Sequence, residues 1–382
     1  MTILSGVQPT GALHLGNYLG AIKRFAKMQD TADCLFCVVD LHAITVKQDP
    51  KVLADNTRAV AAAYLACGIK PEKSIIFAQS SVPEHTELAW VLNCVARVGW
   101  LDRMTQFREK TGTAPDDELE RVIAKYRGVI ADDPAYSDDE TRAIVVHELE
   151  TLLDALSERR SHKEKASVGL YTYPVLQAAD ILLYRATQVP VGDDQKQHLN
   201  LAVDIAKKFN NDFDDLFPIP QTLIGTTGAR VMDLKTGLTK MSKSDVDDSS
   251  RINLTDDDDT IAKKIKRATA DTRPIPGEVE GLADMPSVRN LVTIMAALRD
   301  ISVEEVLAEY QGKGYGVFKP DLANVVVNHL SPIRREIVSN MEYPNFVNTV
   351  LANGQQQASE RAQETMTAVR QAVGFWTRDY DV

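Results

Sequence analysis

Short apolar runs rich in β-branched residues alternate with helix-like stretches through the first two hundred residues, and this alternation restricts the fold more than any other feature. We expect strands at residues 3–7, 35–39, 74–78 and 188–191. We expect helices to begin near Gly16, Lys51 and Pro83 and to cover residues 174–184 and 195–209. Strands that alternate with helices predict an α/β fold, a parallel sheet with helices on both faces. Ligands of such sheets bind at the carboxyl ends of the strands.

Helical periodicity replaces the strand pattern beyond about residue 256. The expected helices cover residues 261–268, 286–298, 303–310, 321–329 and 356–373. We therefore divide the chain into an α/β domain, residues 1–245, and a mostly helical domain, residues 246–382.

A segment at about residues 111–160 looks inserted into the α/β domain. It holds two helical patterns separated by Asp132-Asp133-Pro134, which predicts a helical hairpin. The apolar stripes of this hairpin need cover, and its own chain, a second subunit or RNA would provide it.

The net charge of −11 is concentrated in two segments. Residues 111–160 carry a net charge of −7 and residues 245–259 one of −6, which leaves the rest of the chain at +2. The acidity therefore does not exclude a nucleic-acid partner. No apolar run approaches the roughly 20 residues that cross a bilayer. The first residues lack the features of a signal peptide, so we expect a cytoplasmic protein that does not bind a membrane.

Cys34 and Cys37 form a C-x-x-C pair, which is compatible with a redox or a metal site. They lie in an expected buried strand, where residues three apart point to opposite faces. No second C-x-x-C or histidine cluster accompanies them. We therefore expect two buried thiols and no disulfide framework.

The residues after the first expected strand suit a nucleotide phosphate. They read Ser5-Gly6-Val7-Gln8-Pro9-Thr10-Gly11-Ala12-Leu13-His14-Leu15-Gly16-Asn17-Tyr18, a strand end, a loop and a helix start. Backbone N–H groups and the positive end of a helix dipole point at such a loop. His14 and Asn17 can hydrogen-bond a phosphate whose charge changes during a reaction. The loop is neither a P-loop nor a G-x-G-x-x-G.

A second polar loop lies far downstream and reads Lys240-Met241-Ser242-Lys243-Ser244. Two lysines and two hydroxyls on one loop can clamp a triphosphate tail. Such a pentapeptide alone is usually a solvated loop, but its pairing with the first motif favours a nucleotide site.

Together the two loops resemble class I aminoacyl-tRNA synthetases. His14-Leu15-Gly16-Asn17 resembles their HIGH signature, and Lys240–Ser244 is identical to their KMSKS signature. Residues 39–45, 173–184, 190–198 and 310–316 look like the tryptophanyl-tRNA synthetase family. The resemblance covers nearly the whole chain except the segment at about 111–160. It implies a Rossmann-like doubly wound catalytic domain and a helical domain that binds tRNA and its anticodon.

The resemblance implies a two-step ligase reaction. The carboxylate of L-tryptophan attacks the α-phosphorus of ATP, and the tryptophanyl group then passes from the adenylate to tRNA(Trp). A carboxylate is already a nucleophile at neutral pH, so the protein has to position the substrates and stabilise charge. By the same resemblance His14 and Asn17 act in catalysis, and Lys240, Lys243 and Lys110 bind the leaving pyrophosphate. Mg²⁺ is expected on the ATP phosphates.

No protein metal site is expected. The aspartates at 256–259 resemble a metal site in composition, but consecutive aspartates usually form a solvated turn or a helix start.

The expected helix that begins at Pro174 carries the amino-acid pocket. Gln177, Asp180 and Ile181 share one helical face, together with Tyr184. A carboxylate buried there needs a donor, and the indole N–H of tryptophan is one. Asp180 matches the acid that binds indole in the family. The residues that the resemblance assigns to tryptophan are Leu4, Gly6, Gln8, Val39, Tyr173, Gln177, Asp180, Ile181, Val189, Val191 and Gln195.

The resemblance also assigns an ATP site. Its residues are Gln8, Pro9, Thr10, Gly16, Asn17, Gly192, Asp193, Asp194, Val231, Lys240, Met241, Ser242, Lys243 and Ser244. One position departs from the family, because better-known bacterial members often have methionine where this chain has Gln177. This difference bears on selectivity and not on the reaction.

Partners and alternatives follow from the same motifs. Residues 261–273 carry five basic side chains that would contact tRNA phosphates or form a solvated helix face.

The family is typically a homodimer, which we expect here. The alternatives are a tyrosyl-tRNA synthetase, a synthetase-like protein that binds RNA or senses tryptophan, and an enzyme that adenylates for another acceptor.

Overall fold

The computed structural model describes residues 1–105, 147, 166–190, 192, 195–223, 229–243 and 245–376. Within these ranges one parallel sheet has the strand order β3-β2-β1-β4-β5. Its strands are β1 (Thr2–Val7), β2 (Asp33–Val38), β3 (Ser74–Ala78), β4 (Gln188–Val189) and β5 (Gln221–Thr222). The order turns back at β1, which pairs with β2 on one side and β4 on the other. This is the point in a doubly wound sheet where ligands bind.

The expected parallel sheet is confirmed. The first three strands lie where their β-branched runs predicted them, and β4 is shorter than residues 188–191. We missed β5, because a strand of two residues has no alternation to detect.

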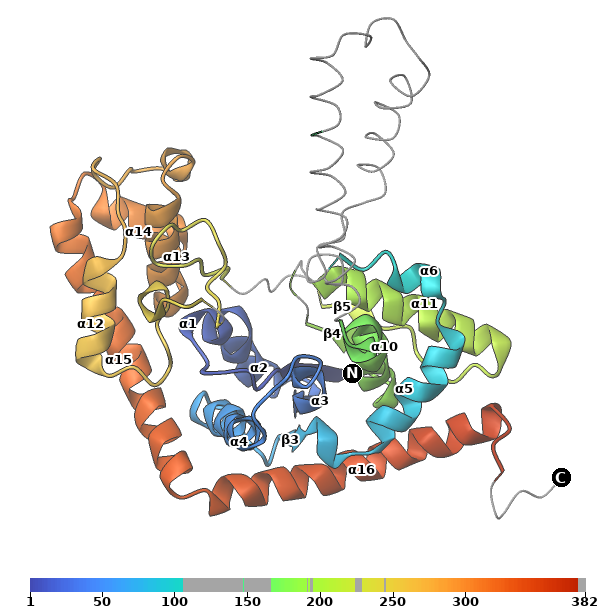
Figure 1. Cartoon of the computed structure of the whole chain (residues 1–382). Coiled ribbons are helices and arrows are strands. Elements are labelled where there is room, and N and C mark those ends of the chain that lie inside the picture. Colours follow the sequence, from blue (N-terminus) through green and yellow to red (C-terminus); the bar gives the residue numbers. More distant parts are fainter. Residues whose placement is uncertain are drawn as a thin grey trace, which may run out of the picture.

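Helices cover both faces of the sheet (Figure 1). In the α/β part they are α1 (Leu15–Asn17), η1 (Tyr18–Ile22), α2 (Lys23–Met28), α3 (Asp40–Ala43), α4 (Pro50–Ala66), η2 (Gln79–Ser81), α5 (Glu84–Val95), α6 (Val98–Leu101), α10 (Val168–Leu183) and α11 (Lys196–Asp212).

Helix α10 begins earlier than predicted. We expected it to start at Pro174, but it starts at Val168, and Ser167 caps it by accepting a hydrogen bond from the backbone N–H of Leu170. Pro174 lies inside the helix, where it lacks the N–H that would bond to the preceding turn. The serine cap outweighs the proline as a start signal.

The residues beyond 245 form helices, as predicted. They are η5 (Asp248–Ser250), α12 (Asp258–Arg267), η6 (Val279–Leu282), α13 (Pro286–Arg299), α14 (Val303–Tyr310), α15 (Tyr315–Glu342) and α16 (Asn345–Ala372). Two of them are much longer than expected. Helix α15 contains Pro320 and Pro332, between which we had placed a short helix, and α16 continues through Gly354.

The two faces of the sheet have separate apolar cores. Cys34 belongs to the core that β1 and β2 share with α4, α13 and α15. Cys37 belongs to the core formed with α5, α10 and α11. Both thiols are buried and free, which confirms the expectation of two buried cysteines on opposite faces.

Helix α16 crosses the edge strand β3 and joins the two cores. Val347 and Val350 pack in the first core, and Ala358 and Ala362 pack in the second. At the crossing a Cβ on Gly354 would lie 1.8 Å from the carbonyl oxygen of Ile76. Only a glycine lets the helix backbone approach the strand so closely. Figure 1 shows α16 passing from α15 beneath the sheet to α5.

The division of the chain at residue 245 stays a prediction. The segment at about residues 111–160 lies outside the described residues, apart from His147. Among the described helices, none is long and apolar enough to cross a membrane.

Candidate active site

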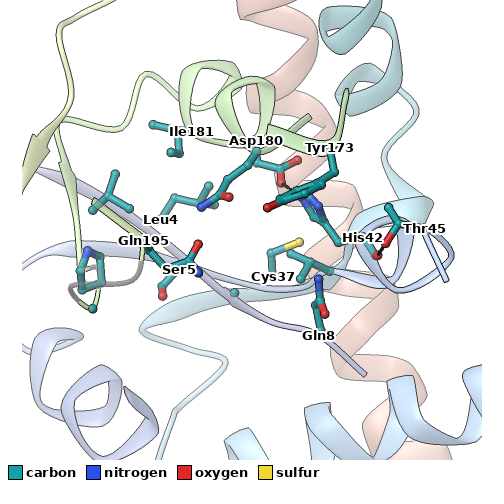
Figure 2. A pocket seen from close by; sticks show the side chains of 16 residues that line it. Leu4, Ser5, Gln8, Cys37, His42, Thr45, Tyr173, Asp180, Ile181 and Gln195 are labelled. Atoms are coloured by element: carbon teal, nitrogen blue, oxygen red, sulfur yellow. Dashed lines mark hydrogen bonds and ion pairs between the residues drawn. The ribbon is translucent and has the colours of Figure 1, made fainter. Parts of the chain in front are cut away.

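A cavity of about 410 Å³ opens at the carboxyl ends of β1, β2 and β4. Ligand pockets commonly have volumes of about 300–1,000 Å³. Leu4 and Ser5 come from β1, His42 and Thr45 from α3 and the residues after it, and Asp180 from α10 (Figure 2). The cavity therefore joins elements far apart in the sequence.

The cavity brings together the residues expected to bind tryptophan, as far as the structure describes them. These are Leu4, Gly6, Gln8, Val39, Tyr173, Gln177, Asp180, Ile181, Val189 and Gln195. Gly192, expected at ATP, also lines it. Val191 lies outside the described residues. The lining residues that we missed are Ser5, Cys37, His42, Thr45 and Pro190.

Asp180 lies on the cavity wall, where its buried carboxylate has three hydrogen-bond partners. Its Oδ1 accepts hydrogen bonds from Gln79 Nε2 at 2.7 Å and from His85 Nδ1 at 2.6 Å. Its Oδ2 lies 2.9 Å from Nε2 of His42. Burial alone would raise the pKa of Asp180, but the hydrogen bonds from His42 and His85 outweigh it and lower the pKa below its usual range. The carboxylate is therefore ionised at neutral pH.

Gln79 and His85 were not predicted. Gln79 directly follows β3, and His85 lies in the first turn of α5, with its Nε2 2.8 Å from the Tyr184 hydroxyl. Both lie at the carboxyl end of a parallel strand, the position that would have identified them. They fix the orientation of the Asp180 carboxylate. Because a carboxylate offers about four acceptor positions, it can accept a further donor from the cavity.

His14 is buried at the start of α1 in a reciprocal cap. Its Nδ1 accepts the backbone N–H of Asn17 at 3.3 Å, and its own backbone N–H donates to Asn17 Oδ1 at 3.1 Å. Burial, with smaller contributions from Lys243, Arg251 and Lys240, lowers the pKa of His14 to about 4. The imidazole is neutral at pH 7, and because Nδ1 is an acceptor its proton lies on Nε2. His14 therefore presents one hydrogen-bond donor.

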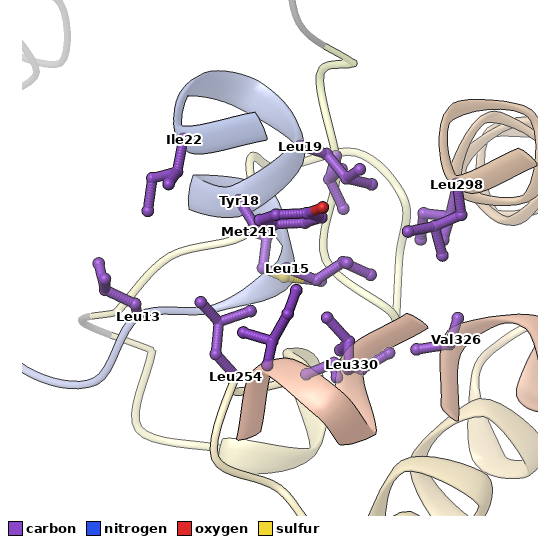
Figure 3. Close-up of a cluster of buried hydrophobic side chains, with 14 of the residues drawn as sticks. Leu13, Leu15, Tyr18, Leu19, Ile22, Met241, Leu254, Leu298, Val326 and Leu330 are labelled. Atoms are coloured by element: carbon purple, nitrogen blue, oxygen red, sulfur yellow. The ribbon is translucent and has the colours of Figure 1, made fainter. Parts of the chain in front are cut away.

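The loop that carries Lys240 and Lys243 lies against the loop that follows β1. Lys243 Nζ donates to the carbonyl of Gln8 at 3.0 Å, and burial lowers its pKa to about 8. A Cβ on Gly16 would lie 3.0 Å from His14 Nδ1 and 3.4 Å from Met241 Cβ. Figure 3 shows Met241 in the same apolar cluster as Leu15 and Tyr18. Two stretches separated by more than two hundred residues thus form one site.

The chain is similar to known proteins. The family model for class I tRNA synthetases (W and Y) matches residues 1–120 and 142–331. The tryptophan–tRNA ligase of Caulobacter vibrioides is 50% identical over 376 residues, which cover 98% of this chain and 95% of that protein. The chain belongs to the tryptophanyl-tRNA synthetase family. Its enzyme class is therefore that of the aminoacyl-tRNA ligases.

Solved structures of tryptophanyl-tRNA synthetases support the same assignment. The enzyme from Mycoplasma pneumoniae has a TM-score of 0.78 at 29% identity, over 100% of this chain and 99% of that one. The enzyme from Campylobacter jejuni, complexed with ADP and tryptophan, has a TM-score of 0.73 at 30% identity, over 98% of this chain and 100% of that one. The Rossmann-like fold expected from the resemblance is confirmed.

The synthetase family match also bears on the segment that looked inserted. It omits residues 121–141 and resumes at 142. The part of residues 111–160 that the family does not share is therefore shorter than we expected.

Several expected synthetase site residues lie outside the described residues: Lys110, Asp193, Asp194 and Ser244. Their roles stay predictions. Of the other residues expected at ATP, Pro9 and Val231 are buried, whereas Lys240 is exposed.

The aspartate run before α12 is a helix start. Asp257 caps α12 by accepting the backbone N–H of Thr260, and Asp256 pairs with Lys264 at 2.7 Å. Within the described part of the chain, no group of three His, Cys, Asp or Glu side chains is placed to hold a metal ion.

The basic patch at residues 261–273 is smaller than its composition suggests. Lys264 is buried against Asp248 and Asp256. Arg273 pairs with Asp271 and Asp284. The remaining basic side chains are exposed: Lys263, Lys266 and Arg267.

Proposed function

We propose that this chain activates L-tryptophan with ATP and transfers the tryptophanyl group from tryptophanyl-adenylate to tRNA(Trp). The observation that carries the proposal is the buried, ionised Asp180 on the wall of a cavity beside the two signature loops. A carboxylate at this place can accept the indole N–H. The solved relative from Campylobacter jejuni with ADP and tryptophan, 30% identical over nearly its whole length, supports the same substrates.

In the first step the tryptophan carboxylate attacks the α-phosphorus of ATP, and pyrophosphate leaves. Lys240 and Lys243 bind the pyrophosphate, with Lys110 as a third cation, and Mg²⁺ enters on the ATP phosphates as part of that substrate. Each good charge-stabilising contact contributes roughly 3–4 kcal/mol to lowering the barrier. His14 donates from Nε2 without carrying a charge, so it can bind a phosphate oxygen without repelling the lysine cations nearby. No residue has to act as general base in this step.

The amino acid is held at both ends. Asp180 accepts the indole N–H, and Leu4, Val39 and Val189 contact the ring. Gln8, Tyr173 and Gln195 bind the ammonium end, and Gln177 adjusts selectivity. A tyrosine hydroxyl is also a donor, so Asp180 alone does not separate tryptophan from tyrosine. The tryptophan–tRNA ligase relatives favour tryptophan.

We further propose contacts to tRNA through the exposed Lys263, Lys266 and Arg267 of α12. Contacts of this kind bind phosphates without reading sequence and weaken with salt. The reaction belongs to translation, for which we propose a cytoplasmic location.

A homodimer is also proposed. Trp90 of α5, Val98 of α6 and Val168 of α10 are exposed, by 69%, 67% and 78%. Helix α10 packs against both α5 and α6, and we propose that a second copy of the chain covers the three side chains.

The test is ATP–pyrophosphate exchange with each of the twenty amino acids, for the wild type and Asp180→Ala. We expect exchange with tryptophan alone, largely lost in the variant. Exchange with tyrosine would retain the reaction and refute the pocket assignment. No exchange with any amino acid, from folded protein with Mg²⁺, would favour a protein that only binds RNA or tryptophan.

A further inference from the structure

The backbone that carries Lys240 and Lys243 is one arm of a small hairpin. Its other arm is Val231–Asp233, with the backbone N–H of Asp233 donating to Thr239 at 2.8 Å. The backbone N–H of Met241 donates to the carbonyl of Val231 at 3.1 Å. Lys240 is therefore paired directly with Met232 across the hairpin. Any displacement of the arm Val231–Asp233 therefore moves the arm that carries the two lysines.

The turn of the hairpin is rigid, because Asp233 organises it. Its Oδ1 accepts the backbone N–H groups of Lys235 and Thr236 at 2.9 and 2.7 Å. Its Oδ2 accepts the hydroxyl of Thr239 at 3.0 Å. These hydrogen bonds tie the turn together, so contacts that hold Val231–Asp233 from outside also bear on the position of Lys240.

The side chain of Asn290 in α13 hydrogen-bonds the backbone of the arm Val231–Asp233. Its Oδ1 accepts the backbone N–H of Met232 at 2.8 Å. Its Nδ2 donates to the carbonyls of Met232 and Asp233 at 2.9 and 3.2 Å. The side chain is 3% exposed, so water cannot readily replace these hydrogen bonds. A buried amide that loses such partners is costly.

The start of α13 holds the tip of the same hairpin. Gly237 has φ +65°, and a Cβ there would lie 2.6 Å from Cα of Ser287. The Ser287 hydroxyl donates to the carbonyl of Thr236 at 2.9 Å. The first turns of α13 thus contact the hairpin at both its arm and its tip.

The far end of α13 lies beside the helices that follow His14. Lys23 Nζ of α2 donates to the carbonyl of Ala297 at 2.7 Å, and Leu298 belongs to the apolar cluster that contains Tyr18 and Met241 (Figure 3). One helix therefore links the hairpin that carries the lysines to the helices that follow His14.

We propose that Asn290 is a positioning residue for adenylate formation, which sets the place of Lys240 and Lys243 over the ATP phosphates. This inference rests on the proposed function, because it takes the two lysines as the pyrophosphate clamp. Asn290 itself lines no part of the cavity and acts through the hairpin.

The experiment compares Asn290→Ala with the wild type in ATP–pyrophosphate exchange and in tryptophan binding without ATP. We expect kcat/KM for ATP to fall on the order of tenfold to a hundredfold, since an error of about 1 Å in placement has such effects. Tryptophan affinity should change less than about twofold, because its cavity is built by β1, β2 and α10. Ser287→Ala removes one hydrogen bond at the hairpin tip and should give a smaller loss in the same direction.

Asn210→Ala is the matched control. Asn210 of α11 also clasps a loop, donating to the carbonyl of Phe217 at 2.7 Å and accepting its N–H at 3.0 Å. Among the described residues its hydrogen bonds go to residues 215–217 and not to the hairpin. We therefore expect kcat/KM for ATP of the Asn210→Ala variant to stay at the wild-type value. A loss for Asn210→Ala equal to that for Asn290→Ala would overturn the proposal, because general destabilisation would then explain both.

A double-mutant cycle separates this proposal from the function on which it rests. In a Lys240→Ala, Lys243→Ala background, Asn290→Ala should change kcat/KM for ATP by less than about twofold, because the groups it positions are gone. An undiminished effect overturns the positioning role alone. If removal of the two lysines leaves exchange unchanged, the clamp itself is refuted and the positioning role with it.

Discussion

Replacing Gly354 by alanine should destabilise the protein, although the change alone favours a helix. Alanine in a helix interior is more stable than glycine by about 1 kcal/mol. Against this, the new Cβ would lie 1.8 Å from the carbonyl oxygen of Ile76, where ordinary contact begins at 3.4 Å. Helix α16 would have to retreat from β3 by about 1.6 Å, the difference between these two distances.

The size of the effect follows from these two opposing contributions. Overpacking of this kind costs about 1–3 kcal/mol, and so large an overlap belongs at the upper end. After the gain in helix propensity, the free energy of unfolding should fall by about 2 kcal/mol. Both cores should loosen together, because α16 contributes to each.

Urea unfolding and amide hydrogen exchange test this prediction. We expect a lower unfolding midpoint and faster exchange in β3. Gly316→Ala is the control, since a Cβ there meets nothing within 4 Å, and it should cause no loss of stability. If Gly354→Ala were as stable as the wild type, α16 would not lie against β3 at this distance, and the account of the crossing would be wrong.

Three further predictions concern the site and the assembly. Asp180→Ala should abolish the preference for tryptophan over an analogue whose benzothiophene ring lacks the N–H. A hydrogen bond to a charged group contributes about 1.5–3 kcal/mol, so the wild type should prefer tryptophan roughly 10- to 150-fold in pyrophosphate exchange. A variant that keeps this preference would refute the role of Asp180. Because the pKa of Lys243 is lowered to about 8, its positive charge is lost as the pH rises through that value, and kcat/KM for ATP should fall there. Lys243→Arg should move this fall to higher pH. If the pH profile of the variant is unchanged, the fall belongs to another group. Light scattering should give the mass of a dimer, and a monomer mass independent of concentration would contradict the homodimer.

Local geometry within one stretch of sequence predicted part of the site, and the resemblance to the synthetase family assigned the cavity residues that lie far apart in the chain. His14 and Asn17 are three residues apart on one turn, so their pairing follows from helix geometry. Asp180 shares a helical face with Gln177 and Ile181, and its role as the indole acceptor came from the family resemblance. The alternation of strands and helices likewise predicted the sheet before its order was known.

The missed parts depend on contacts between distant residues. Gln79 and His85 bond to Asp180 from another strand and helix, and nothing in their own neighbourhood pairs them with residue 180. Asn290 is one polar residue on an otherwise apolar helical face, and its partners lie 57 and 58 residues earlier in the sequence. The length of α16 was underestimated because Gly354 reads locally as a weak helix position, while its reason lies in β3.

The crossing of β3 by α16 has a consequence for how the protein is made. The strand is synthesised early, whereas residues 345–372 leave the ribosome only after every element that they cover. Until then the nascent chain presents an open sheet edge, of the kind that pairs with other chains. A chain that ends between α15 and α16 would therefore lack the helix that covers β3. Chaperones and proteases would meet such a chain as a fragment with an exposed edge strand, which α16 covers once it is synthesised.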